Sequence, residues 1–216
     1  MAAAAPFPLL DPPAECAGTD AAEGSEDQLF VVHDVSWEEY ETILAVLGDR
    51  AGVRVTYCEG VLELMSPGGP HEGRKTILAR LVEAYAEEAE LPLSGYGSMT
   101  VRRRLAKRGV EPDECYVLGT VEDGGIPELA IEIIEKSGTI DKLSVYAGLG
   151  VPEVWFLKKG KLSVHLLGPD GYAEAGRSRL LPGIELAELT QFVQREGDQT
   201  SVVRAWRATL RKRSAR

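Results

Sequence analysis

Residues 128–134, ELAIEII, decide the fold of this 216-residue chain. A short and almost continuous apolar run of this kind is typical of a β-strand that is buried on both faces, so we expect it at the centre of a sheet. Glu132 interrupts the run. A buried carboxylate costs several kcal/mol unless it reaches an edge, pairs with a base or binds a cation. The run therefore predicts a central strand and a charged site within it.

Helices are predicted on both sides of this strand. Ser36 and Glu39 form a capping-box pattern ahead of an apolar run and predict a short helix. Apolar residues recur at helical spacing from His71 to about Glu90, which predicts the longest helix of the chain. A further helix is expected over 139–149, with Thr139 as its cap and Ile140 on its core face.

The remaining elements complete an α/β (α+β) pattern. Residues 53–66 predict a hairpin that turns at Glu59-Gly60. Other strands are expected at 98–104, 114–118, 153–157 and 162–167, and two more helices at 185–195 and 201–212. This order predicts a mixed central sheet flanked by helices, with an N-terminal helix and hairpin and a C-terminal hairpin with helices.

Length and composition indicate one globular domain. A chain of 216 residues with 44% hydrophobic residues can bury one ordinary core. Residues 1–28 are rich in Ala, Pro and acids and predict a disordered lead-in, so we expect the domain over 29–196 and a basic C-terminal helix or tail over 197–216.

The sequence also predicts where the protein is found. No stretch approaches the roughly 18 apolar residues of a transmembrane helix, and the start lacks the basic region of a signal peptide. Cys16, Cys58 and Cys115 fit neither a disulfide framework nor a zinc site. We therefore expect a soluble cytoplasmic protein without a membrane partner, whose oligomeric state, with a homodimer as one possibility, stays open.

The net charge of −10 argues against a protein that coats nucleic acid without specificity. Contact with phosphate must then depend on local basic runs. The first of these, VRRRLAKRG, contains Arg102, Arg103, Arg104, Lys107 and Arg108. The second, at the C-terminus, contains Arg204, Arg207, Arg211, Lys212, Arg213 and Arg216.

Asp113 and Glu132 are the candidate metal ligands. Asp113 follows a proline at the entrance of a predicted strand, where it could equally be a turn residue. Two acids on neighbouring strands can converge on one Mg²⁺ or Mn²⁺ ion, which activates water and stabilises charge on a phosphate. Glu132 could instead lie at an edge or pair with a base.

Three further residues are candidates for the same site. Lys142 lies in the first turn of its predicted helix, where the helix dipole disfavours a cation, so it is either an ammonium that assists water and phosphate or a solvated lysine. His71 and Glu72 open the long helix and could reach the end of the sheet. Glu59 and Glu63 are expected to be exposed in the hairpin. Phosphate-binding glycine loops, GxSxG, HExxH and Cys-His zinc motifs are absent.

Ordered segments of the chain resemble a known family. The segments LELMSPGGPHEGRKTILARLVEAYAEE (62–88), EPDECYV (111–117) and PELAIEIIEKSGTIDKLSVYAGLGVPEVWF (127–156) resemble the bacterial restriction endonucleases of the Uma-two family, and the VVRAWRATLRK tail is similar to the family's C-terminal end. The resemblance spans about residues 36–195. It implies a PD-(D/E)XK nuclease core, that is, a restriction-endonuclease-like fold.

The resemblance also implies roles for single residues. It assigns the PD to Pro112-Asp113, the strand acid to Glu132 and the helix glutamate to Glu72. The lysine position two residues after Glu132 is occupied by Ile134, which departs from the motif. Lys142 is then expected to supply the lysine from the following helix, with Lys136 as the other candidate.

The leading hypothesis from the sequence is a metal-dependent endonuclease that hydrolyses DNA phosphodiester bonds. Asp113 and Glu132 would bind Mg²⁺ or Mn²⁺, Lys142 would assist the water, and Glu72 or His71 would complete the site. One alternative is a catalytically inert binding or regulatory module on a nuclease fold, which the departure at Ile134 favours. Another is an interaction protein that works through its C-terminal helix.

Overall fold

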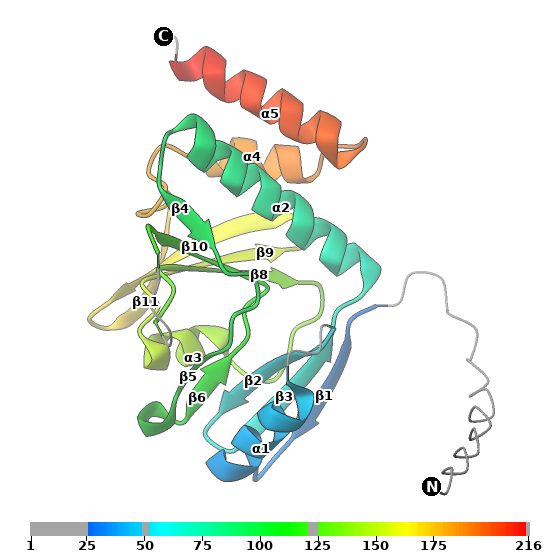
Figure 1. The fold of residues 1–216 in the computed structure, drawn as a ribbon, viewed down its shortest axis with the longest axis vertical. Coiled ribbons are helices and arrows are strands. Elements are labelled where there is room, and N and C mark those ends of the chain that lie inside the picture. Colours follow the sequence, from blue (N-terminus) through cyan, green and yellow to red (C-terminus); the bar gives the residue numbers. More distant parts are fainter. Residues whose placement is uncertain (1–25, 49–51, 121–124, 215–216) are drawn as a thin grey trace, which may run out of the picture.

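A computed structural model describes residues 26–48, 52–120 and 125–214 (Figure 1). Most of the predicted disordered segment, residues 1–25, lies outside the described part of the chain. Gln28, the last residue of that segment, instead begins strand β1 (Gln28–Val32).

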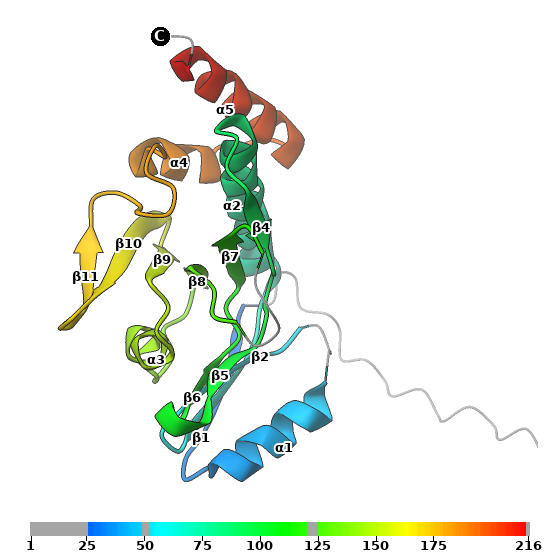
Figure 2. The same ribbon diagram turned by 60° about the vertical axis from the view of Figure 1, so that its left-hand side comes forward.

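Five strands form the N-terminal sheet, which is antiparallel throughout. Their order is β1-β3-β2-β6-β5, with β2 at Arg54–Cys58, β3 at Val61–Ser66, β5 at Val101–Arg103 and β6 at Arg108–Val110. Helix α1 (Trp37–Leu47) starts at the predicted capping box and covers the outer face of this sheet (Figure 2). Tyr40 of α1 stacks on Tyr57 of β2 with ring centroids 4.7 Å apart.

Six strands form the C-terminal sheet in the order β11-β10-β9-β8-β7-β4. They are β4 (Leu93–Gly95), β7 (Glu114–Leu118), β8 (Leu129–Ile134), β9 (Glu153–Lys158), β10 (Lys161–Gly168) and β11 (Gly171–Ala175). Strands β8 and β9 are parallel and the other pairs are antiparallel. The apolar strand β8 lies between β7 and β9, so its predicted central position is confirmed.

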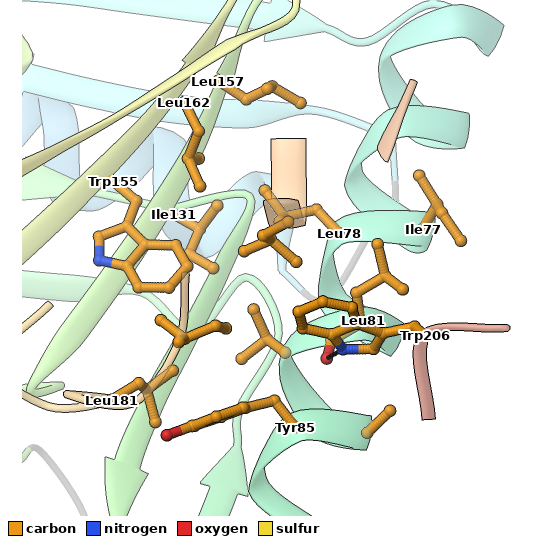
Figure 3. Close-up of a cluster of buried hydrophobic side chains, with 14 of the residues drawn as sticks. Ile77, Leu78, Leu81, Tyr85, Ile131, Trp155, Leu157, Leu162, Leu181 and Trp206 are labelled. Atoms are coloured by element: carbon orange, nitrogen blue, oxygen red, sulfur yellow. Dashed lines mark hydrogen bonds between the residues drawn. The ribbon is translucent and has the colours of Figure 1, made fainter. Parts of the chain in front are cut away.

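Three helices gather at the end of the molecule opposite α1: α2 (Gly69–Glu88), α4 (Leu186–Val193) and α5 (Gln199–Ser214) (Figure 1). They share one apolar core with the C-terminal sheet, in which Leu81, Trp155 and Trp206 are fully buried (Figure 3). The Trp206 indole donates a hydrogen bond to the Leu81 carbonyl oxygen at 2.9 Å, which fastens α5 to α2. The basic C-terminal segment is therefore a helix that packs against α2.

Helix α3 (Lys142–Leu149) connects the parallel strands β8 and β9 and begins later than the sequence predicted. Its N-cap is Asp141, whose side chain accepts a hydrogen bond from the Leu143 amide, and not Thr139. The Thr139 amide instead donates to the Glu63 carboxylate at 3.0 Å, so this residue is fixed to the N-terminal sheet. The expected helix over 139–149 is therefore shorter by about its first turn.

The architecture is mixed α/β, as predicted, but it has two sheets where one was expected. Strands β1, β4, β6 and β11 were not predicted. Strands β4 and β6 have three residues each, too few for alternation to be visible, and β11 carries glycine and alanine. The expected strand over 98–104 is reduced to β5, because a 3-10 helix follows at Arg104–Ala106. Among the helices that the structure describes, none has the length and apolarity needed to cross a membrane.

Candidate active site

Glu132 of β8 is at the centre of the candidate site. Its side chain is 0% exposed, and both carboxylate oxygens are engaged by helix α3. Lys142 Nζ lies 2.6 Å from Oε2, and the Tyr146 hydroxyl donates a hydrogen bond to Oε1. Because Lys142 and Tyr146 are four residues apart, they share one face of the helix and reach the same carboxylate. The acid in the apolar strand is thus paired with a base.

The electrostatics of this pair follow from its burial. Burial raises the pKa of the Glu132 carboxyl, and the nearby Lys142 ammonium opposes this shift without cancelling it. Burial alone would lower the pKa of Lys142, but attraction to Glu132 and Asp113 outweighs burial and leaves that pKa raised. The lysine is therefore cationic at neutral pH.

Asp113 lies beside Glu132 because their strands are neighbours. Strands β7 and β8 are antiparallel with Glu114 opposite Ile131, which brings Asp113, just before β7, opposite Glu132. Asp113 is 1% exposed, and its Oδ2 accepts a hydrogen bond from the Ile133 amide at 2.8 Å. Burial would raise the pKa of this carboxyl, but His71 and Lys142 together lower it, so Asp113 is an anion.

The second carboxylate oxygen of Asp113, Oδ1, has basic neighbours but makes no hydrogen bond within the described residues. His71 Nε2 lies 3.0 Å from Oδ1 and Arg54 Nε lies 3.9 Å from it, so both form close charge contacts. Arg54 is too far from Oδ1 for a hydrogen bond, and among the described residues this buried oxygen has no hydrogen-bond partner. Oδ1 therefore keeps unused capacity to accept a bond.

His71 is fully buried between two carboxylates. Its Nδ1 lies 2.9 Å from Asp27 Oδ2, and its Nε2 faces Asp113. Burial would lower the pKa of His71, but the two acids together raise it. The structure thus brings the predicted residue His71 to Asp113 and adds Asp27, which the sequence did not suggest.

Glu72 and Lys136 lie farther from the two central acids. The Glu72 side chain is 40% exposed and contacts Lys75 at 2.6 Å and Arg54 at 3.7 Å, and Arg54 in turn lies 3.9 Å from Asp113. Lys136 is exposed in the loop after β8. The structure thus brings Lys142, and not Lys136, into contact with Glu132.

Glu63 of β3 is a site residue that the sequence prediction missed. It was expected to be exposed but is only 4% exposed, because the loop before α3 covers it. Its Oε2 accepts from the Thr139 amide, and its charge helps to raise the pKa of Lys142. A Cβ atom at Gly138 would lie 2.3 Å from the same oxygen, so any other residue there would displace the Glu63 carboxylate. A cavity of about 160 Å³ beside Lys142 is lined by Glu63, among others.

The predicted basic run is only partly available to phosphate. Arg102 and Arg103 are exposed on β5. Arg104 pairs with Glu38 and Glu41, and Arg108 pairs with Glu59 at 2.9 Å. Lys107 occupies a left-handed turn with a φ of 48°. In the C-terminal run, Arg207, Arg211 and Arg213 pair with Glu87, Glu88 and Glu188.

Two buried acids on paired strands and a lysine in contact with one of them, held by a mixed sheet between helices, define a restriction-endonuclease-like protein. Residues 37–196 match the sequence model of the Uma2 family, which is described as "Putative restriction endonuclease". The chain belongs to this family. Asp113, Glu132 and Lys142 all lie within the matched range.

Solved structures that resemble this chain include one with low sequence identity. It is the crystal structure of a "putative nuclease belonging to DUF820" from Anabaena variabilis ATCC 29413, with 11% sequence identity and a TM-score of 0.49. The alignment covers 80% of this chain and 99% of that chain. No curated protein matches the sequence.

Proposed function

We propose that this chain is a cytoplasmic, metal-dependent endonuclease that hydrolyses DNA phosphodiester bonds at Asp113, Glu132 and Lys142. One observation carries the proposal: Glu132 is fully buried in the central strand, beside Asp113 and in contact with Lys142 at 2.6 Å. Replacing such a buried ion pair by apolar residues is often neutral or stabilising, so stability alone gives no reason for it. A catalytic use of the ion pair gives a reason for keeping it.

The residues present fit an Mg²⁺ or Mn²⁺ ion. Mg²⁺ usually keeps several waters and is held by one or two carboxylates together with the phosphates of the substrate. Within the described ranges no group of three or more His, Cys, Asp or Glu side chains is placed to hold a metal ion, so the proposal rests on two carboxylates with water and substrate as the further ligands. Asp113, whose buried Oδ1 has no hydrogen-bond partner among the described residues, and Glu132 would hold the ion. When bound, it would supply positive charge at the scissile phosphate and a more acidic water.

The other side chains would orient the attacking water, neutralise charge on the phosphate and hold the two carboxylates in place. Lys142 is cationic beside Glu132, so we assign it to orienting the attacking water and offsetting charge on the phosphate rather than to removing a proton. Tyr146 holds the Glu132 carboxylate by its hydroxyl. The Ile133 amide and His71 hold Asp113 from its two sides, and Glu72 reaches the site through Arg54. These contacts fix the carboxylates before substrate arrives.

DNA as the substrate is supported by the family and by local charge. The exposed Arg102 and Arg103 provide a place for backbone phosphates, although the net charge of −10 lowers association at long range. Cytoplasmic activity agrees with Cys58 and Cys115, which are both free thiols.

Manganese calorimetry and a cleavage assay test the proposal. The wild-type chain should bind manganese and cut DNA when the metal is titrated, with an RNA substrate run in parallel. Asp113→Asn and Glu132→Gln should each lose manganese binding, since the amide keeps the shape and removes the charge. The Gln variant leaves Lys142 buried without its anion, so it should melt lower than wild type and must be measured well below its melting temperature.

A control variant and a contrary outcome are needed to interpret this experiment. Glu90→Gln changes an exposed acid that has no contact with the site residues in the described part of the chain, and it should keep the manganese affinity of wild type. A wild-type chain that neither binds manganese nor cleaves any nucleic acid would overturn the proposal. Retained DNA binding in that case would support the alternative of an inert binding module.

A further inference from the structure

Asp27 is a buried acid outside the region that matches the family. It precedes strand β1 and the matched residues 37–196, yet it is only 6% exposed. Its two oxygens have separate partners: Oδ1 accepts from the Gly68 amide at 2.8 Å, and Oδ2 lies 2.9 Å from His71 Nδ1. Both contacts are buried, so this acid is held by directed bonds and not by solvent.

The contact with Gly68 accounts for only one of these two oxygens. Gly68 is the N-cap of α2 and has no side chain to cap the helix. A carboxylate at this end satisfies a free amide and complements the helix dipole, which is an ordinary structural role. The second oxygen, however, is directed at an imidazole that faces the proposed metal ligand.

The ring of His71 connects Asp27 to Asp113. A partner at one ring nitrogen fixes the orientation of an imidazole and the group that its other nitrogen presents. In this chain the other nitrogen, Nε2, lies 3.0 Å from Asp113 Oδ1. The opposite oxygen of Asp113 is fixed by the Ile133 amide. The place of Oδ1, which has no hydrogen-bond partner among the described residues, therefore depends on where His71 is held.

We infer that Asp27 is a positioning residue that acts on Asp113 through His71. The inference rests on the proposed function for its consequence, because the carboxylate so positioned is the one that would bind metal. The segment before the family-matched region is then part of the active site. Loss of a residue that holds a metal ligand typically lowers metal affinity about 10- to 100-fold, and Asp27, which acts through that residue, should give the lower end of this range.

Three single variants of the full chain test this role. Asp27→Ala removes both contacts, and Asp27→Asn keeps the shape but removes the carboxylate. Glu26→Gln is the matched control, because Glu26 is the adjacent acid and is exposed. Two NMR signals report on the metal-free proteins: the ring nitrogens of His71, and the Ile133 amide, which is bonded to Asp113. Manganese affinity and melting temperature are measured on the same samples.

In Asp27→Ala both NMR signals should shift, and manganese affinity should fall about 10-fold or more. Asp27→Asn should shift both signals with a smaller loss of manganese affinity. If the Ala variant does not fold, the Asn variant alone tests whether Asp27 positions Asp113. Glu26→Gln should match wild type in every measurement. A purely structural role would lower the melting temperature alone.

The inference is overturned if His71 or Ile133 keeps its wild-type signal in the folded Asp27 variants, or if manganese affinity is unchanged in them. Failure of the proposed function looks different. In that case the wild-type chain itself binds no manganese, while the two NMR signals still show whether Asp27 positions Asp113.

Discussion

Two acid–base clusters of this chain use the same chemistry in opposite surroundings. Glu132 is enclosed in the central strand with Lys142, whereas Glu88 of α2, whose side chain is 15% exposed, meets the partly exposed Arg207 and the exposed Arg211 of α5. Burial raises the pKa of Glu132, while the hydrogen bonds from the arginines lower the pKa of Glu88 to about 2. The two carboxyls thus depart from their ordinary pKa in opposite directions.

This difference separates the two roles. A surface pair contributes little and is screened by salt, so Glu88 and its arginines serve mainly to orient α5 on α2. A buried pair must overcome the loss of hydration of both charges. The Glu132–Lys142 pair therefore indicates a use beyond stability, and variants of the two clusters should behave differently in cleavage and in stability.

The largest effect is expected for Lys142→Ala. Cleavage should fall by at least about 100-fold, because loss of a positioned acid–base or charged group typically costs about 10²- to 10⁴-fold in rate. DNA binding should be largely kept, since Lys142 is one mostly buried cation. Single-turnover cleavage and a binding titration, both on the folded variant, measure the two quantities.

Lys136→Ala is the matched control, because Lys136 is the other lysine that follows Glu132 and is exposed. It should retain most of the cleavage activity. An inactive Lys136→Ala beside an active Lys142→Ala would reverse the assignment of the lysine.

The central elements could be predicted because their signals are local. The apolar run of β8, the capping box of α1 and the periodicity of α2 depend on neighbouring residues, and each element lies where the pattern placed it. Lys142 was also expected to reach the carboxylates, because the helix that it starts must return over the sheet. The proximity of Asp113 and Glu132 followed from their being on neighbouring strands.

The missed site residues depend on contacts between distant parts of the chain. Glu63 is buried by Thr139, 76 residues away, and Asp27 is buried by His71, 44 residues away. Alternation along β3 indicates only that Glu63 lies on the face opposite Leu62. It cannot show that a loop from the other sheet covers that face. The N-terminal sheet escaped prediction as a separate sheet for the same reason, since its strands β5 and β6 have three residues each and are defined by their partners.

An intermediate effect is expected for the exposed arginines of β5. Replacing Arg102 and Arg103 by Gln should reduce the slope of log K against log salt for DNA binding by about 1.8, at roughly 0.9 for each lost phosphate contact. Adding Arg104→Gln should change the slope little further, because Arg104 is already paired with Glu38 and Glu41. Binding titrations at several salt concentrations give the slopes. An unchanged slope in the double variant would assign these arginines to a solvated surface.

The smallest effect is expected for Glu88→Gln, and it appears in stability against pH. The folded chain holds the pKa of Glu88 near 2, below its ordinary value of 4.5, because Arg211 and Arg207 bond the ionised form. A lowered folded pKa gives stability that is present above about pH 4.5 and is lost as the pH falls toward 2. Wild type should therefore lose more stability than Glu88→Gln over that window, and the two denaturation curves should converge near pH 2. Cleavage at neutral pH should be the same in both proteins, because Glu88 belongs to the α2–α5 contact and not to the site. If Glu88→Gln reduced cleavage as Lys142→Ala does, the surface cluster would be coupled to the site and the contrast between the two clusters would fail.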